Sequence, residues 1–359
     1  MESVVRSVKR ACAAGLDSVT LRRTIADRLL PALSFDAHAF GACDPDTGLM
    51  THVVADGVPP RLVQQYVEHY YPEYCARLAM DGGPNGDRVF SMSKAVPEIA
   101  AVKRANGIRF DTFVSLVSGG RIWGTWCLMR LLPTARTTAR DEALLRALAP
   151  HMARGLQAAA LVDRGLAAQP DEDDSAPGVL VLDARNRLVL RTPIALRLLH
   201  DLADVGIANP YEVPLCVMAL VSRLRSIPAD LPRDISVRTR GMSGHWYVLR
   251  ASLAEANEYG DNATVIVVRR AVPREVATIL TTLYELSGRE REVIAEVLRG
   301  GSTKEIAVRL GVSPHTVDEH IERACQKIGA RGRKALVAKL FFDGYAPFVG
   351  QSRPALPTL

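Results

Sequence analysis

The sequence predicts a multidomain protein in which α+β domains are followed by an all-α domain of four helices. Strand-like stretches pair around turn residues between positions 37 and 131 and again between 178 and 269. The segment from Ala168 to Gly178 is acidic and rich in proline, which is typical of a linker. From about Val272 onward, helix-capping patterns replace the strand patterns. We therefore expect two α+β domains and then a helical one.

The first predicted domain spans residues 1–165 and contains two hairpins between two helices. Apolar residues at helical spacing indicate both helices. Strand-like stretches on either side of turn residues indicate the hairpins. The expected elements are a helix around Leu21–Leu30, strands at 37–42, 50–54, 113–117 and 122–131, and a helix over 139–161.

A linker over residues 166–177 precedes the second predicted domain, which spans residues 178–271. Its order of two strands, a helical middle and three further strands is that of a small α+β fold. The third predicted domain spans residues 272–350 and is helical. The strands expected in the second domain lie at 178–183, 187–191, 235–240, 245–251 and 263–269.

Composition and residue spacing exclude several classes of protein. Hydrophobic residues make up 48% and charged residues 23% of the chain, as in ordinary globular proteins. No apolar run reaches the roughly 18 residues of a membrane span, and the N-terminus lacks the apolar core of a signal peptide. The 6 cysteines show no CxxC spacing, and no histidine has a partner at metal-ligand spacing. We therefore expect a cytoplasmic protein with no membrane contact and no metal site, and no pattern identifies a cofactor.

The third domain carries the most specific pattern in the chain. Residues 287–290 and 302–305 each fit a capping box, in which a serine hydroxyl caps a helix and a glutamate three residues later reaches back. Gly311 permits a sharp turn after the second capped helix. Ser313 then caps a third helix that has Pro314 at its first position. Two capped helices joined by a glycine-containing turn predict a helix-turn-helix, which lays its second helix in the major groove of DNA.

This segment resembles the LuxR/GerE type of DNA-binding domain, with the family's spacing throughout. The resemblance implies four helices, double-stranded DNA as a partner, and a homodimer on a near-palindromic site in which the fourth helix contributes to dimer contacts. The end of the chain also resembles actinobacterial members that carry a GAF-like sensor upstream. The matching stretches are Leu286–Val293, Lys304–Ala307, Leu310–Val317, His320, Lys327–Gly329, Arg331–Arg333 and Leu336–Val337, with Leu336–Phe342 and Tyr345–Pro347 for the actinobacterial type.

The expected DNA-contacting residues lie on the recognition helix and at the helix ends beside it. Basic side chains are expected to contact phosphates. Acidic residues occupy groove-facing positions where well-studied members are often basic or small, and they can accept hydrogen bonds from cytosine N4. The candidates are Lys304, Ser313, His315, Thr316, Asp318, Glu319, Glu322, Arg323, Lys327, Arg331 and Arg333.

The two upstream domains resemble sensor folds in their order of elements. The first resembles a GAF domain, because a helix precedes two hairpins and a long helix closes the domain. The second resembles a PAS domain. Aromatic residues of the first domain are candidates to line a small-molecule site, although a buried core is the commoner fate of such residues. The aromatic candidates for the lining are Phe40, Tyr66, Tyr70, Tyr71, Phe110, Phe113, Trp123 and Trp126, and those chosen for ligand binding are Phe40, Tyr70, Phe113, Trp123 and Trp126.

We interpret the chain as a sequence-specific, DNA-binding transcription regulator. A signal sensed by the GAF-like and PAS-like region would be transmitted to the C-terminal helix-turn-helix. No nucleophile–base pair or catalytic motif is in place, so we expect no enzymatic activity. The alternative is a signal-binding interaction protein that regulates a partner protein and has weak or no DNA binding, because acidic side chains on the recognition helix repel phosphate.

Overall fold

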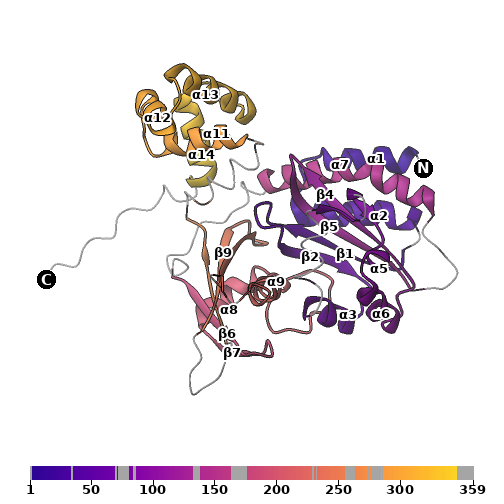
Figure 1. The fold of residues 1–359 in the computed structure, drawn as a ribbon. Helices are drawn as coiled ribbons and strands as arrows, with labels where there is room; N and C mark the ends of the chain where they lie inside the picture. Colours follow the sequence, from indigo (N-terminus) through magenta and orange to yellow (C-terminus); the bar gives the residue numbers. More distant parts are fainter. Residues whose placement is uncertain are drawn as a thin grey trace. The chain divides into compact units, whose positions relative to one another are not determined.

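The chain folds into one unit built on two sheets and one unit built of helices (Figure 1). The structure, a computed structural model, describes residues 2–33, 35–68, 71, 81–83, 86–131, 138–162, 176–228, 230–231, 233–254, 263–272, 275, 284 and 286–345. The sheet unit comprises Met1–Leu166 with Asp173–Arg270, and the helical unit comprises Ala167–Glu172 with Ala271–Leu359. This architecture confirms the predicted fold class. The expected domain boundaries at 165, 177 and 271 stay a prediction.

The first sheet has five antiparallel strands in the order β2-β1-β5-β4-β3. Figure 1 shows α1, α2 and α7 on one face of this sheet and α3, α5 and α6 on the other. The strands are β1 (Ala37–Cys43), β2 (Met50–Asp56), β3 (Val89–Phe90), β4 (Phe110–Ser118) and β5 (Arg121–Arg130). The helices are α1 (Glu2–Cys12), α2 (Ser18–Leu33), α3 (Pro60–Gln65), α5 (Met92–Ala95), α6 (Pro97–Ala105) and α7 (Ala139–Val162).

The expected hairpins and both expected helices of this part are confirmed as β1–β2, β4–β5, α2 and α7. Side chains alternate between the two faces of a strand, so neighbouring residues of β1 point in opposite directions. Phe40 and Trp126 are fully buried and stack with their ring centroids 4.8 Å apart. The sequence patterns did not predict α1, α3, β3, α5 or α6, most of which are short.

The second sheet repeats the strand order of the first, as β7-β6-β10-β9-β8, and it is also antiparallel. All five strands expected in this part are confirmed. Both of its helices pack against the sheet. The elements are β6 (Gly178–Leu182), β7 (Leu188–Arg191), α8 (Pro193–His200), α9 (Leu215–Arg225), β8 (Asp234–Arg240), β9 (Trp246–Leu253) and β10 (Thr264–Arg270).

Helix α9 is buried on nearly every side because it lies between the two sheets. It packs against β8 and β9 of the second sheet and against β2 of the first. Seven consecutive residues, from Leu215 to Val221, are buried. A helix that is apolar all round is stable in water only when other elements surround it. The apolar sequence of α9 therefore joins the two sheets through a common core.

The outer edge of β2 forms backbone hydrogen bonds with the segment between α8 and α9. The amide of Ala55 donates to Val205 O and the amide of Val205 donates to Val53 O, both at 2.9 Å. Asp204 accepts from the amide of Val53 and from the amide of Leu215, each at 2.9 Å. One half-buried carboxylate therefore holds the edge of β2 and the first residue of α9 together. Burial raises the pKa of Asp204 to about 6.

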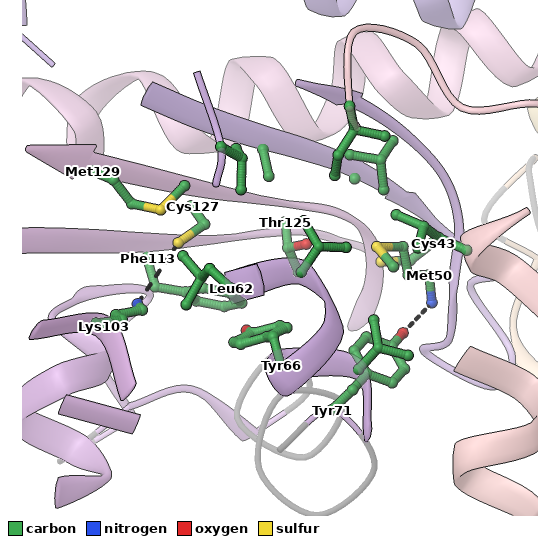
Figure 2. Close-up of a pocket in the computed structure, with 18 of the residues that line it drawn as sticks. Cys43, Met50, Leu62, Tyr66, Tyr71, Lys103, Phe113, Thr125, Cys127 and Met129 are labelled. Atoms are coloured by element: carbon green, nitrogen blue, oxygen red, sulfur yellow. Dashed lines mark hydrogen bonds between the residues drawn. The ribbon is translucent and has the colours of Figure 1, made fainter. Parts of the chain in front are cut away.

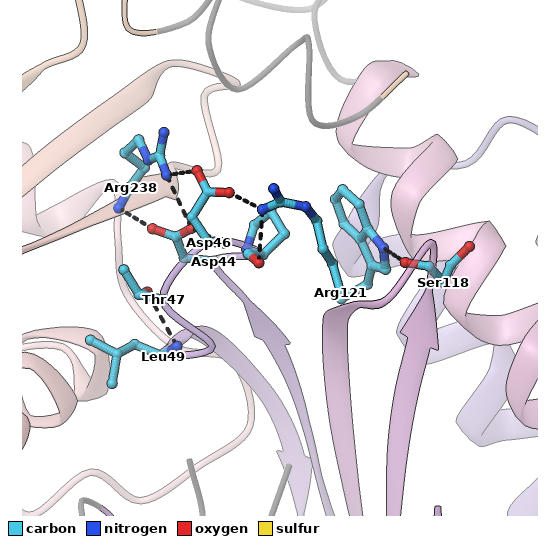
Figure 3. Close-up of polar contacts among 9 residues, drawn as sticks. Asp44, Asp46, Thr47, Leu49, Ser118, Arg121 and Arg238 are labelled. Atoms are coloured by element: carbon cyan, nitrogen blue, oxygen red, sulfur yellow. Dashed lines mark hydrogen bonds and ion pairs between the residues drawn. The ribbon is translucent and has the colours of Figure 1, made fainter. Parts of the chain in front are cut away.

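A second polar cluster joins the turn after β1 to β8 (Figure 3). The amide of Arg238 donates to Asp44 at 2.9 Å, and the Arg238 guanidinium pairs with Asp44 at 3.6 Å and also with Asp46. Arg121 of β5 pairs with the same Asp46. Asp44 is buried, and its carboxylate is matched by a cation and a hydrogen-bond donor, as a buried charge requires. Contacts near both ends of β2 thus hold the two sheets together.

Four helices surround one apolar core in the described part of the helical unit. They are α11 (Gly288–Leu298), α12 (Thr303–Leu310), α13 (Pro314–Ile328) and α14 (Arg333–Tyr345). Val293, Ile306, Val317 and Leu336 are buried at its centre, one from each helix. The expected fourth helix, about 333–342, is confirmed and ends at Tyr345. Within the described residues of the whole chain, no helix is long and apolar enough to cross a membrane.

We expect Gly206→Ala to destabilise the protein far more than Gly120→Ala. The two glycines have φ of 71° and 72°, so alanine meets the same left-handed strain of about 1–2 kcal/mol at either position. A Cβ at residue 206 would lie 2.1 Å from Ala55 O, whereas one at residue 120 would meet no described atom within 4 Å. Urea unfolding should show an additional loss of more than about 2 kcal/mol for Gly206→Ala. Equal losses would contradict close contact between residues 204–206 and β2.

Candidate functional site

Local hydrogen bonds at two serines set the first two helices of the candidate DNA-binding site. Ser287 Oγ accepts from the amide of Glu290 at 3.2 Å, and the Glu290 carboxylate accepts from the amide of Ser287 at 2.7 Å. Ser302 and Glu305 repeat this pair of bonds at 3.3 and 2.8 Å. Both expected capping boxes are therefore confirmed. They satisfy amides that a helix leaves without partners in its first turn.

The turn between α12 and α13 has the expected geometry. Gly311 is in the left-handed conformation, with φ of 65° and ψ of 36°. Ser313 Oγ accepts from the amide of Thr316 at 3.0 Å, and Pro314 occupies the first position of α13. These residues stop one helix and start the next within a few positions, which produces the helix-turn-helix unit.

Helix α13 buries one stripe and exposes the opposite one. The buried stripe consists of Val317, Ile321, Ala324, Cys325 and Ile328. None of the expected DNA-contacting residues belongs to this stripe, and all of them have accessible surface. Thr316 and Arg333 are half-buried, and the others are exposed, namely Lys304, Ser313, His315, Asp318, Glu319, Glu322, Arg323, Lys327 and Arg331.

Two of the three acidic residues on α13 already have partners. Asp318 Oδ1 accepts from Thr303 Oγ1 at the start of α12, at 3.1 Å. Glu319 lies between His315 Nδ1, at 3.5 Å, and Arg323 Nη2, at 3.4 Å. Asp318 therefore braces α13 against α12, and the charge of Glu319 is offset by a neighbouring cation. Glu322 lies one turn further along and is exposed.

The expected phosphate-binding residues fall into two groups. Lys327 Nζ pairs with Glu290 of α11 at 2.7 Å, and Arg333 donates to Gly301 O. Burial alone would raise the pKa of Glu290, but its hydrogen bonds with Lys327 and Ser287 lower it below the usual value. These two cations therefore hold helices together. The other expected phosphate-binding residues, Lys304, Arg323 and Arg331, are exposed.

A second candidate site is a cavity between the first sheet and the segment that begins with α3 (Figure 2). Of the aromatic residues expected in the lining, Tyr66, Tyr71 and Phe113 line it and Phe110 does not. Phe40, Trp123 and Trp126 are buried but do not line this cavity, and Tyr70 lies outside the described residues. Most of its walls were not anticipated from the sequence, because they are small or aliphatic. The lining residues include Ala39, Gly41, Cys43, Met50, Val53, Leu62, Val63, Tyr66, Lys103, Phe113, Thr125, Cys127, Met129, Ile207 and Leu215.

Within the described part of the chain, no three His, Cys, Asp or Glu residues come together in a way that could hold a metal ion.

Comparison with known proteins identifies the helical unit. The family model for bacterial regulatory proteins of the luxR family matches residues 284–340. The spore germination protein GerE of Bacillus subtilis (strain 168) is 46% identical over 59 residues, which cover 16% of this chain and 80% of GerE. The chain belongs to the luxR family. The helix-turn-helix built from α12 and α13 is thus the DNA-binding element of a luxR-family transcription regulator.

Two further proteins show weaker or shorter similarity to the chain. The probable transcriptional regulatory protein NarL of Mycobacterium tuberculosis (strain ATCC 25618 / H37Rv) is 44% identical over 54 residues, which cover 15% of this chain and 25% of NarL. The GAF domain of a phosphoenolpyruvate-protein phosphotransferase from Coxiella burnetii is 16% identical, with a TM-score of 0.31, and the match covers 43% of this chain and 90% of that domain.

We expect Lys327→Ala to destabilise the helical unit, whereas Arg323→Ala should leave its stability nearly unchanged. Removal of Lys327 leaves the buried Glu290 carboxylate without its cation, at a cost of about 1 kcal/mol because Lys327 is partly exposed. The Arg323–Glu319 pair lies between exposed side chains and contributes little. Urea unfolding followed by circular dichroism measures both variants. Equal stability of the two variants would contradict the bracing role of Lys327.

Proposed function

We propose that this luxR-family chain is a one-component regulator that binds double-stranded DNA as a homodimer and catalyses no reaction. The observation that carries the proposal is the helix-turn-helix itself, in which a buried stripe on α13 leaves the other stripe exposed. Such a helix fits the major groove, and two copies would read a near-palindromic site. Because the protein would act on bacterial DNA, it would lie in the cytoplasm.

Contacts to DNA divide by chemistry. Lys304, Arg323 and Arg331 are exposed cations that would bind phosphates without regard to sequence. Ser313 and Thr316 lie at the start of α13, where helix amides also favour phosphate. Glu319 and Glu322 would accept hydrogen bonds from cytosine N4 and so select particular base pairs. The ion pair with Arg323 reduces the repulsion that Glu319 exerts on phosphate.

The sheet unit would sense the signal, and α14 would contribute to the dimer. Helix α7 is a second candidate for dimer contact, although it already covers a face of the first sheet. The alternative of an interaction protein that does not bind DNA draws on the acidic recognition helix alone. The pairing of Asp318 and Glu319 within the helical unit weakens that alternative.

A gel-shift titration on the promoter region of the chain's own gene tests the proposal. Lys304, Arg323 and Arg331 of each protomer would make about six phosphate contacts in a dimer, so the affinity should fall by about 10³-fold between 50 and 200 mM salt. Arg323→Ala should weaken binding to all sequences alike and reduce the salt dependence. Glu319→Ala should instead relax the preference at one base pair.

A folded dimer that gives no shift at any salt concentration would overturn the proposal in favour of the interaction protein. The same effect of Arg323→Ala and Glu319→Ala on every sequence would contradict the division between phosphate and base contacts.

A further inference from the structure

The cavity in the sheet unit has walls from both sheets' parts of the chain. Ala39, Gly41 and Thr125 come from the first sheet, whereas Ile207 and Leu215 come from the segment between β7 and β8. Val53 also lines the cavity, and the amides of Val53 and Leu215 are the two groups that Asp204 holds. A molecule in the cavity would therefore contact the residues that join the two sheets.

The described lining carries no uncompensated charge. Lys103 is its one charged residue, and Lys103 Nζ pairs with Asp111 at 2.8 Å while both side chains are at most 2% exposed. Asp111 also accepts from Ser91 Oγ at 2.9 Å and from the amide of Met92 at 2.9 Å. Burial alone would raise the pKa of Asp111, but Lys103 and these donors lower it, so the carboxylate stays ionised. The ammonium and the carboxylate neutralise each other.

The remaining polar atoms of the lining are weak or neutral groups. Burial raises the pKa of Cys43 to about 12 and also raises the pKa of Cys127, so both thiols stay protonated at neutral pH. Figure 2 shows the Thr125 hydroxyl among the apolar side chains at the cavity wall. The hydroxyl of Tyr71 accepts from the amide of Met50. Among the described lining residues, a charged ligand would lose its hydration without gaining a counter-ion, which is strongly unfavourable.

The size of the cavity bounds its occupant. Its volume is about 90 Å³. An apolar cavity of about 150 Å³ in another protein takes up benzene or xenon. Met50 and Met129 lie in the lining, and methionine side chains are flexible enough to yield space. An occupant near the size of benzene therefore fits after modest movement of these side chains.

We propose that this cavity, which lies between the first sheet, α3 and the residues Ile207 and Leu215, binds an uncharged, largely apolar small molecule of about the size of benzene. The proposal rests on the proposed role of the sheet unit as sensor and names the chemical class that it senses. An occupant would contact both Val53 and Leu215, whose amides bond to Asp204. Its binding would therefore affect the contacts that hold the two sheets together.

Thermal unfolding of the full chain with matched aromatic probes tests this class of ligand. Benzene and toluene are neutral, while benzoate and benzylammonium carry one charge of either sign on a similar ring. At a concentration ten times the dissociation constant, benzene should raise the midpoint by about 3–5 °C. The charged probes should bind at least about tenfold more weakly, because each must be desolvated without a partner.

Substitutions of lining residues test whether benzene binds in this cavity. Val63→Leu adds one methylene inside the cavity, and Val189→Leu makes the same change at an exposed position of β7 that is 66% accessible. Val63→Leu should weaken benzene binding several-fold and Val189→Leu should not change it. Ala39→Leu should fill the cavity and abolish the shift. If Ala39→Leu does not fold, the comparison of Val63→Leu with Val189→Leu still tests the proposal.

Three outcomes would overturn the proposal: no response of the folded protein to benzene or toluene, an equal response to benzoate, or unchanged binding in Val63→Leu. The gel shift separates this result from the proposed function. A chain that shifts DNA but does not bind benzene loses only the ligand class. A chain that binds benzene but gives no gel shift loses only the DNA-binding function.

Discussion

An edge strand presents backbone N–H and C=O groups that need partners, and β2 finds them in the part of the chain that builds the second sheet. Val205 pairs with Val53 and Ala55, Thr239 Oγ1 donates to Thr51 O, and Asp204 takes the amide of Val53. Without these partners, the buried groups along β2 would each be costly. The position of the second sheet against the first follows from this requirement.

Several other features depend on these contacts between β2 and the part of the chain that builds the second sheet. Helix α9 is apolar along most of its length, and both sheets pack against it. Asp204 supplies a hydrogen-bond acceptor to its first amide, since Pro214 before it has no polar side chain to do so. Gly206 is required because a Cβ would collide with Ala55 O. The cavity exists between the same elements, so its occupant and these contacts share residues. Sensing and architecture are therefore coupled in the sheet unit.

The sequence predicted those features whose causes are local. The capping boxes at Ser287 and Ser302 and the turn at Gly311 involve residues at most three positions apart, and all were confirmed. Asp204 and Val53 are 151 positions apart, so no local pattern could pair them. The same limit applied to Lys327, whose partner Glu290 is 37 positions away. Aromatic residues predicted the cavity only in part: Tyr66, Tyr71 and Phe113 line it, whereas Phe40 and Trp126 stack on each other. The small residues Ala39 and Gly41, which also line it, carry no such sequence signal.

Native-state hydrogen exchange in urea tests most directly whether the two sheets form one cooperative unit joined at β2. We predict that amides of β5 in the first sheet and of β10 in the second open with the same free energy and the same dependence on urea. The amides of Val53 and Ala55 should exchange with them. If β10, Val53 and Ala55 opened together at a lower free energy while β5 stayed protected, the second sheet would be an independent domain and the account would be contradicted.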